Sequence, residues 1–344
     1  MKKTRAGKPL DFTLITNPIG PSNKARHAMR RAIKTVQYRP DGEAQFLTRY
    51  LCNKEGVAAE QVLLGHGSSH ILNLLVQALK PGSILVPSPF PQAYPELLQK
   101  QGAEIRPFPP DRAGGFEFDT QKFEAHWRDT EAALILNPHN PTGRTVPERD
   151  IIDLIETSER LGKLLIIDET LGEFTDSASP ARRAAEAGHV LILRTFSWYH
   201  ALVGLRLGYA IGHPALLDKL RSRMDPWPVN GIALAAALAS LKDKGYRRRT
   251  AEFLAAEKAY VLTKLRGLTG ARLQVTPWGF LIQVQPPISN VRQLFFEKGI
   301  LVEAYFATQG EEYVAFPLRS RPQNARFLRV LQRILREQKT NNQG

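Results

Sequence analysis

Apolar and polar positions alternate in blocks along the first two thirds of the chain. Four short runs of mostly isoleucine, leucine, valine and alanine lie among stretches whose apolar residues recur at helical spacing, as in 148–161. Runs this short are typical of buried strands, and strands that alternate with helices predict a parallel, doubly wound sheet with helices on both faces. The four expected strands are 83–87, 132–136, 164–167 and 190–193.

The pattern changes in the last third of the chain. A long helical stretch at 231–268 has an alanine-rich half and a charged half, and a hairpin-like pair of strands follows at 273–284. Two more strands are expected at 300–306 and 313–318, and an amphipathic helix at 324–337 ends the pattern. This mixture of helices and strands predicts a smaller α+β domain.

The two patterns together predict four segments. A basic arm precedes a turn-rich strap, DFTLITNPIGP, and a first helix, and the two domains follow. The expected bounds are 1–10 for the flexible arm, 11–40 for the strap and the helix, which pack with the small domain, 41–225 for the large domain and 226–344 for the small domain.

Composition places the chain among globular proteins. Of its 344 residues 43% are hydrophobic, and no apolar run reaches the ~18 residues of a membrane span. The sequence MKKTRAGKPLDF lacks the apolar centre of a signal peptide, so we expect a cytoplasmic location. The single cysteine, Cys52, has no internal partner, and no spacing of cysteine and histidine predicts a metal site.

The chain is strongly basic, with 47 lysines and arginines, 33 aspartates and glutamates and a formal charge of +14. The charge is densest in the arm, at Arg247–Arg249 and in the tail around Arg333, Arg336 and Lys339. A phosphorylated small molecule would suit this charge, whereas no nucleic-acid-binding motif accompanies it. We therefore expect a solvated basic surface, with no dedicated nucleic-acid site and no membrane contact.

One candidate anion site follows the apolar segment that ends at Leu64. The sequence GHGSSH contains Gly67, Ser68 and Ser69 and opens the expected helix at 71–79. Glycines and hydroxyls at the start of a helix place backbone NH groups and the positive end of the helix dipole around an anion. The segment therefore predicts a phosphate site.

A second group of the same kind follows the apolar run at 190–193. The next residues, TFSWYHALVGLRLGY, contain Thr195, Ser197 and Arg206. Hydroxyls beside a cation are also suited to an anion. Because ligands of doubly wound sheets bind at the carboxyl ends of strands, both groups are expected at one edge of the sheet.

Three motifs resemble those of fold-type I pyridoxal phosphate enzymes, in particular the branch of histidinol-phosphate aminotransferase and threonine-phosphate decarboxylase of cobalamin synthesis. NPHNPTG at 137–143 matches N-P-x-N-P-T-G, and Asp168 and Phe174 match D-E-x-Y-x-x-F. TFSWYHALVGLRLG matches T-x-S-K-x-x-x-L-x-G-L-R-x-G except at the lysine. The likeness extends from Asp11 to the last helix. It implies a large, mostly parallel domain, a small α+β domain and a homodimer.

The resemblance also assigns roles around a pyridoxal phosphate or pyridoxamine phosphate cofactor. The residues that match its phosphate site are Gly67, Ser68, Ser69, Ser197 and Arg206.

Other matches lie around the ring of that cofactor. Asn140 matches the donor to the phenolic oxygen, and Asp168 matches the carboxylate that pairs with the pyridine nitrogen. Phe90 is the expected aromatic residue that stacks on the ring, although alignment of Tyr94 would place Pro91 there.

Two further matches lie near the first helix. Asn17 belongs to a segment that lies across the active-site entrance in the family, and we include it among the substrate-contacting residues. Tyr38 resembles a tyrosine that reaches the phosphate of the neighbouring subunit, with one residue inserted before the following Pro-Asp pair.

The chain departs from the family where the chemistry takes place. Trp198 stands at the lysine that forms the Schiff base and moves the proton, and an indole has no basic nitrogen. Leu171 replaces the tyrosine that touches the phenolic oxygen. We therefore expect that ordinary transamination is lost.

The arginine that binds the substrate carboxylate in the family is also replaced. Phe316 or Ala315 stands at its position, depending on the register. Arg319 and Arg321 are close enough in sequence to substitute for it.

Three functions remain open. The first is an aminotransferase-like protein that holds the cofactor, or a similar phosphate-bearing molecule, noncovalently. The second is an altered enzyme whose base is His200, two residues after Trp198. The third is a noncatalytic partner of an active homologue.

Overall fold

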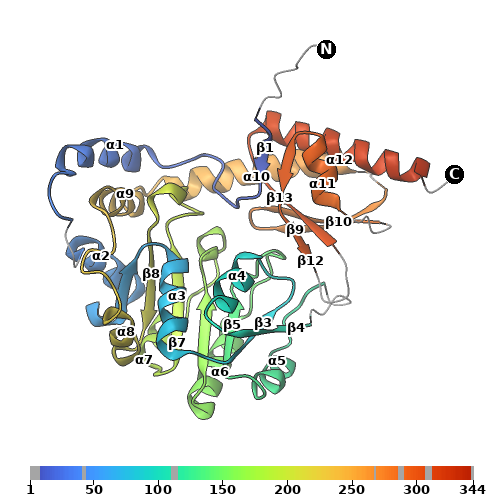
Figure 1. Cartoon of the computed structure of the whole chain (residues 1–344). Helices are drawn as coiled ribbons and strands as arrows, with labels where there is room; N and C mark the ends of the chain where they lie inside the picture. The colour runs from blue at the N-terminus through green and yellow to red at the C-terminus, as the bar shows by residue number, and fades with distance from the viewer. Residues whose placement is uncertain are drawn as a thin grey trace.

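The computed structural model describes residues 8–40, 44–109, 115–266, 269–285, 290–306 and 312–341, with side chains up to residue 338. A seven-stranded sheet forms the centre of the larger part, in the order β2-β8-β7-β6-β5-β3-β4 (Figure 1). Only β8 runs antiparallel to its neighbours, so the prediction of a mostly parallel sheet is confirmed. The strands are β2 Val62–Gly65, β3 Ser83–Pro87, β4 Glu104–Phe108, β5 Ala132–Leu136, β6 Leu164–Asp168, β7 Val190–Thr195 and β8 Gly208–Gly212.

Helices cover both faces of this sheet because its strands are apolar on both sides. Alternate residues of β6 point to opposite faces, so Leu165 and Ile167 join one core cluster and Leu164 and Ile166 join the other. The helices in this part are α2 Gln45–Glu55, α3 Ser68–Leu79, α4 Ala93–Gln99, α5 Thr120–Trp127, α6 Glu148–Leu161, α7 Ala181–Glu186 and α8 Pro214–Arg221, with short 3-10 turns η2 Ala59–Gln61, η3 Gly172–Phe174 and η4 Val203–Leu205.

A four-stranded antiparallel sheet, in the order β12-β13-β10-β9, forms the centre of the carboxyl-terminal part. The strap joins this part, because β1 (Leu10–Phe12) pairs in parallel with β11 (Ile300–Val302). The remaining strands are β9 Ala271–Thr276, β10 Gly279–Val284, β12 Ala304–Phe306 and β13 Glu312–Pro317, and the helices are α10 Tyr246–Leu265, α11 Val291–Glu297 and α12 Arg321–Asn341.

Two elements expected to be continuous are divided. The expected helix at 231–268 is two helices, α9 (Gly231–Leu241) and α10, because the chain turns at the polar sequence KDKG. The expected strand at 300–306 is also two strands, since Glu303 separates β11 from β12 and each pairs with a different sheet.

The first helix and α9 lie side by side in Figure 1. The first helix is α1 (Asn23–Ala32), continued by the 3-10 turn η1 (Ile33–Thr35). Although α9 follows residue 226, Ala233 and Ala236 pack in a core cluster of the large sheet. The expected domain bounds stay predictions.

Candidate functional site

Three strand ends bring the two predicted anion-binding segments together. In the register of the sheet, Gly208 of β8 pairs with Gly65 of β2 on one side and with Thr195 of β7 on the other. The chain is so close here that a Cβ atom on Gly208 would lie 2.5 Å from the backbone nitrogen of Ser68. Glycine at this position therefore lets the start of α3 approach β8.

Arg206 lies over the amino terminus of α3. Its Nη2 donates a hydrogen bond of 2.8 Å to Oγ of Ser69. A Cβ atom on Gly67, which precedes the helix with a φ of +83°, would lie 2.7 Å from the same nitrogen. The structure thus places Gly67, Ser68, Ser69 and Arg206 around one helix terminus, where a guanidinium, hydroxyls and backbone NH groups all favour negative charge.

The hydroxyls of Thr195 and Ser197 lie at the end of β7, next to β8. Thr195 donates to Oγ of Ser197 at 3.0 Å, and its own Oγ1 accepts the backbone NH of Ser197 at 3.1 Å. Both side chains are buried. This local network fixes the turn that leads from β7 to Trp198.

Asp168 stands at the carboxyl end of β6, as predicted, but a tyrosine already contacts it. Its Oδ1 accepts the backbone NH of Thr170 at 2.8 Å, and its Oδ2 accepts the hydroxyl of Tyr94. Burial raises the pKa of Asp168, although these two hydrogen bonds oppose the rise. Burial, and then the charge of Asp168, raises the pKa of Tyr94 well above its ordinary value, so the tyrosine remains a donor.

A second tyrosine contacts the other polar group expected to face a ring. The hydroxyl of Tyr305, on β12, donates to Oδ1 of Asn140 at 3.1 Å. Burial, and then Glu303, raises the pKa of Tyr305 above its ordinary value. The sequence interpretation missed Tyr94 and Tyr305 as partners of these groups, and no spacing in the sequence links either tyrosine to its acceptor.

Trp198 and Leu171, the two positions predicted to be replaced, share one apolar cluster. The half-buried Trp198 packs against a group formed by Ile15, Leu171 and Trp278. An indole and an isobutyl group therefore lie where the resemblance implied an amine and a phenol. Neither group can take up or release a proton here, so these two side chains supply packing surface.

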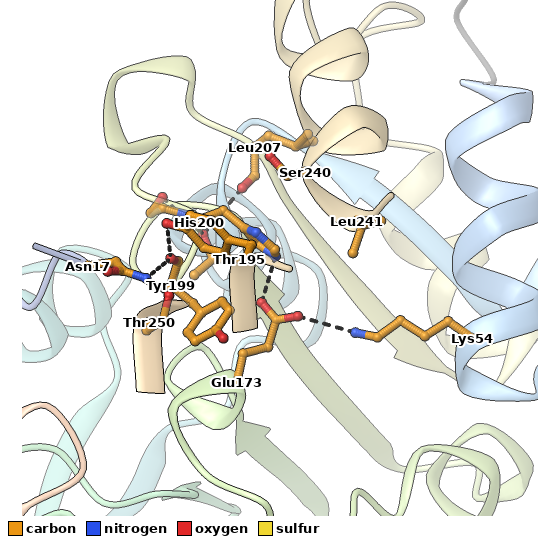
Figure 2. Close-up of polar contacts among 12 residues, drawn as sticks. Asn17, Lys54, Glu173, Thr195, Tyr199, His200, Leu207, Ser240, Leu241 and Thr250 are labelled. Carbon is orange, nitrogen blue, oxygen red and sulfur yellow. Dashed lines mark hydrogen bonds and ion pairs between the residues drawn. The ribbon is translucent and has the colours of Figure 1, made fainter. Parts of the chain in front are cut away.

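Asn17 holds the strap against the Trp198 loop. Its Nδ2 donates to the carbonyl of Tyr199 at 3.0 Å and to Oγ1 of Thr250 at 2.8 Å (Figure 2). Its backbone NH donates to the carbonyl of Trp198 at 2.9 Å. These contacts support a structural role for Asn17, and its predicted contact with substrate stays a prediction.

His200 faces a carboxylate. Its Nε2 lies 2.8 Å from Oε2 of Glu173, whose other oxygen lies 3.3 Å from Nζ of Lys54 (Figure 2). The imidazole is buried and stacks on Tyr246. Burial disfavours the charged form of Glu173, but His200, Lys54 and Arg194 outweigh it and hold the pKa of Glu173 well below its ordinary value. The contact with Glu173 gives His200 a structural partner, and its role as a base stays a prediction.

Phe316 and Ala315 are the two candidate positions for the arginine that binds the substrate carboxylate in the family, and their surroundings differ. Phe316 points into the carboxyl-terminal core and stacks on Phe327 with 3.9 Å between ring centroids. Ala315 lies on the opposite face of β13 and packs in the same cluster as Tyr305, which reaches Asn140. Of the two options, Ala315 is therefore the one on the side of the candidate site.

Arg319 and Arg321 both make contacts within the chain. Arg319 donates to three carbonyls of the strap, those of Asp11, Leu14 and Thr16. Arg321 pairs with the buried Glu257 at 2.9 Å. These partners give both arginines structural roles and support neither as a substitute carboxylate clamp.

Phe90 and Tyr38 are the last two predicted residues. Phe90 is half-buried and, like Tyr94, packs against a core cluster of the large sheet. Tyr38 is 67% exposed, in a segment that also exposes Ile33, Val36 and Phe46. Stacking by Phe90 and a contact of Tyr38 with a neighbouring subunit stay predictions.

In the described part of the chain, no cluster of metal-ligating side chains is found. None of the helices described there is long and apolar enough to cross a membrane.

Comparison with known proteins agrees with the fold and with the motifs. The chain is 33% identical over 328 residues to histidinol-phosphate aminotransferase 1 of Thiobacillus denitrificans, which covers 93% of this chain and 83% of that protein. It is 30% identical to the histidinol-phosphate aminotransferase of Symbiobacterium thermophilum, over 93% of this chain and 89% of that protein.

A solved structure shows the same fold. The histidinol-phosphate aminotransferase of Sinorhizobium meliloti, in complex with pyridoxal-5'-phosphate, superposes with a TM-score of 0.85 at 18% identity, over 96% of this chain and 92% of that one. The profile of the family "Aminotransferase class I and II" matches residues 23–319. This chain therefore belongs to the class I and II aminotransferases, a family that depends on pyridoxal phosphate.

Proposed function

We propose that this protein binds a phosphate-bearing small molecule noncovalently in an aminotransferase cleft, and that it has no ordinary aminotransferase activity. The observation that carries the proposal is the contrast between Arg206, which lies over the start of α3 and contacts Ser69, and Trp198, which packs with Leu171 at the position of the lysine. The first arrangement suits an anion, whereas the second supplies no amine.

Both the charge and the geometry of the residues around Arg206 support the proposed anion site. Arg206 would form charge-assisted hydrogen bonds with phosphate oxygens, and the NH groups at the start of α3 would supply further donors. Gly67 has no side chain that would separate these groups. A phosphate could therefore contact the guanidinium and the helix terminus at the same time.

The residues fit one end of pyridoxal phosphate and not the other. The phosphate end fits the groups around Arg206. At the ring end, Trp198 offers no attachment point, and Tyr94 donates to the Asp168 oxygen that a pyridinium would need. These residues support no catalytic step that uses the cofactor. We therefore propose that pyridoxal phosphate or pyridoxamine phosphate binds only noncovalently, and that it competes with Tyr94 for Asp168.

Calorimetry with inorganic phosphate and with pyridoxal phosphate tests the anion site. We expect Arg206→Gln to weaken both affinities about tenfold or more, since a lost charge-assisted hydrogen bond costs about 1.5–3 kcal/mol. Arg149→Gln on the exposed face of α6 is the matched control and should bind like the parent. Equal affinities for parent and Arg206→Gln would contradict the proposal.

A transamination assay with histidinol phosphate tests the second half of the proposal. We expect no turnover by the parent, because neither Trp198 nor Leu171 can form an imine or carry the proton. The purified protein should also release any bound pyridoxal phosphate on dialysis after borohydride treatment. Robust turnover by the parent would overturn this part.

We also propose that the protein is a dimer. Residues of 32–40 and 44–47, together with α9, border a groove of about 500 Å³, and Ile33, Val36, Tyr38 and Phe46 are exposed. So many neighbouring apolar side chains are typical of an interface between subunits. Light scattering should give a dimer, and Val36→Asp with Phe46→Asp should shift it toward monomer. A monomeric parent at micromolar concentration would contradict the proposal.

A further inference from the structure

The outward face of α12 carries four arginines in one row. Arg326, Arg329, Arg333 and Arg336 are exposed and follow each other at intervals of three, four and three residues. With a rise of ~1.5 Å per residue the row extends over about 15 Å. The opposite face packs into the core of the carboxyl-terminal part through Phe327, Leu328, Leu331, Ile334 and Leu335. In Figure 1, α12 lies at the outer edge of the molecule.

Contrary to the solvated basic surface that the sequence predicts, we propose that this arginine row binds the phosphate backbone of a nucleic-acid duplex, independently of its sequence. One strand of a duplex presents a phosphate about every 3.4 Å along the helix axis, so a row of this length faces several phosphates. Guanidinium groups match phosphate oxygens with paired donors and retain their charge at any physiological pH.

Acidic neighbours offset only part of this charge. Glu337 lies 2.7 Å from Nε of Arg333, but the same carboxylate also lies 2.8 Å from Nζ of Lys298. Among the described side chains of α12, Glu337 is the one acidic group beside five arginines. Counted on these two contacts, the four arginines of the row outnumber the one carboxylate beside them.

The shape of the surface decides which anion it fits. The row lies on a helix face and not in a cavity, and single exposed ion pairs contribute only about 0–1 kcal/mol. Several phosphates on one rigid backbone are therefore needed for appreciable binding. A membrane fits less well, because a helix that lies in a lipid surface inserts an apolar face, and the apolar face of α12 is already buried.

The other strongly basic helix, α1, supplies a matched control. Lys24, Arg30, Arg31 and Lys34 are exposed there, and no acidic residue occurs between residues 21 and 40. This region adjoins the apolar groove that we assign to the subunit interface. If charge alone were responsible for binding, removal of four charges from α1 or from α12 would have the same effect.

The experiment measures the binding of a fluorescent 20-base-pair DNA duplex over a salt series. The test variant changes all four arginines of the α12 row to glutamine, and the control changes the four cations of α1 to glutamine. We expect the test variant to reduce the slope of log affinity against log salt by about 3 to 4, which makes its loss of affinity between 50 and 200 mM salt about 100-fold smaller than that of the parent. The control variant should behave like the parent.

A third variant with lysine at the same four α12 positions should keep the slope, and circular dichroism should show the same fold for all variants. An RNA duplex should bind as DNA does, since the proposed contacts involve the backbone alone. Equal losses in the α12 and α1 variants, an unchanged slope in the α12 variant, or tighter α12-dependent binding to phosphatidylserine vesicles than to DNA would each overturn the proposal.

Discussion

The two ends of the candidate cleft are built from very different groups. At the phosphate end, Gly67 and Gly208 let the start of α3 lie close to β8, and Arg206 lies over that helix terminus. At the ring end, Trp198 and Leu171 pack in an apolar cluster, and Asp168 and Asn140 each accept a hydrogen bond from a tyrosine. The close backbone approach at the phosphate end is part of the fold, whereas the groups at the ring end are side chains.

Under the proposed function, the anion site has outlasted the reaction of the family. The close approach of β8 to α3 is part of the sheet, so its loss would disturb the core. A lysine that points into a cleft has no such structural role, and an indole that packs with Leu171 and Trp278 adds buried apolar area instead. The stability of the fold therefore does not require a reactive side chain at this position.

Trp198→Lys gives the largest expected change, because it converts a site with no attachment point into one that has an amine. We expect mass spectrometry after borohydride treatment to show covalent pyridoxal phosphate on the variant and none on the parent. Transamination should still be absent, since Leu171 and Ala315 cannot orient a substrate and poor positioning forfeits much of the ~7–11 kcal/mol available. Efficient turnover by the variant would show that Trp198 is the only lesion.

Gly208→Ala should disrupt the phosphate end because it destabilises the close contact between β8 and the start of α3. The new Cβ atom would meet backbone atoms of Ser68 and Arg194 at 2.5 and 2.7 Å, and such overpacking costs about 1–3 kcal/mol. Chemical denaturation measures the change in the free energy of unfolding. Gly204→Ala is the matched control, since no atom lies within 4 Å of the position that its new methyl group would take, and a similar loss there would contradict the explanation.

Glu173→Gln tests the ion pair behind the ring end. The pKa of Glu173 is lowered in the folded protein from an ordinary value of 4.5, so its charge stabilises the fold above about pH 4.5 and this contribution disappears as the pH falls further. At pH 7 the variant should lose about 1.5–3 kcal/mol of unfolding free energy. Denaturation curves at pH 7 and below pH 4 should show the difference shrinking. A constant difference would exclude an electrostatic origin.

Tyr94→Phe should have the smallest effect and the opposite sign. Removal of the hydroxyl frees an oxygen of Asp168, and a net hydrogen bond is worth about 0.5–1.5 kcal/mol, so pyridoxal phosphate should bind up to about tenfold more tightly. Fluorescence titration measures this affinity. Tyr246→Phe removes a hydroxyl bound to the carbonyls of Gly20 and Tyr199 and should leave the affinity unchanged. Weaker binding by Tyr94→Phe would show that Tyr94 assists the ligand.

The sequence predicted those features that depend on neighbours along the chain. The strand at 132–136 occurs as expected, and the helix expected at 71–79 occurs but begins three residues earlier, at Ser68. Both follow from local apolar runs and from glycine. The contacts of Tyr94 and Tyr305 could not be predicted, because each hydroxyl meets an acceptor 74 or 165 residues away. The hydrogen-bond partners of Arg319 could not be predicted for a similar reason, since they lie about 300 residues earlier in the chain.

Arg319 and Asn17 together make the strap a short tether that connects the two parts of the molecule through hydrogen bonds. Arg319, which follows β13, holds the carbonyl of Thr16, and the next residue, Asn17, is held by Trp198, Tyr199 and Thr250. Movement of the carboxyl-terminal sheet away from the Trp198 loop is therefore limited by the reach of the Arg319 side chain, unless one of these hydrogen bonds breaks.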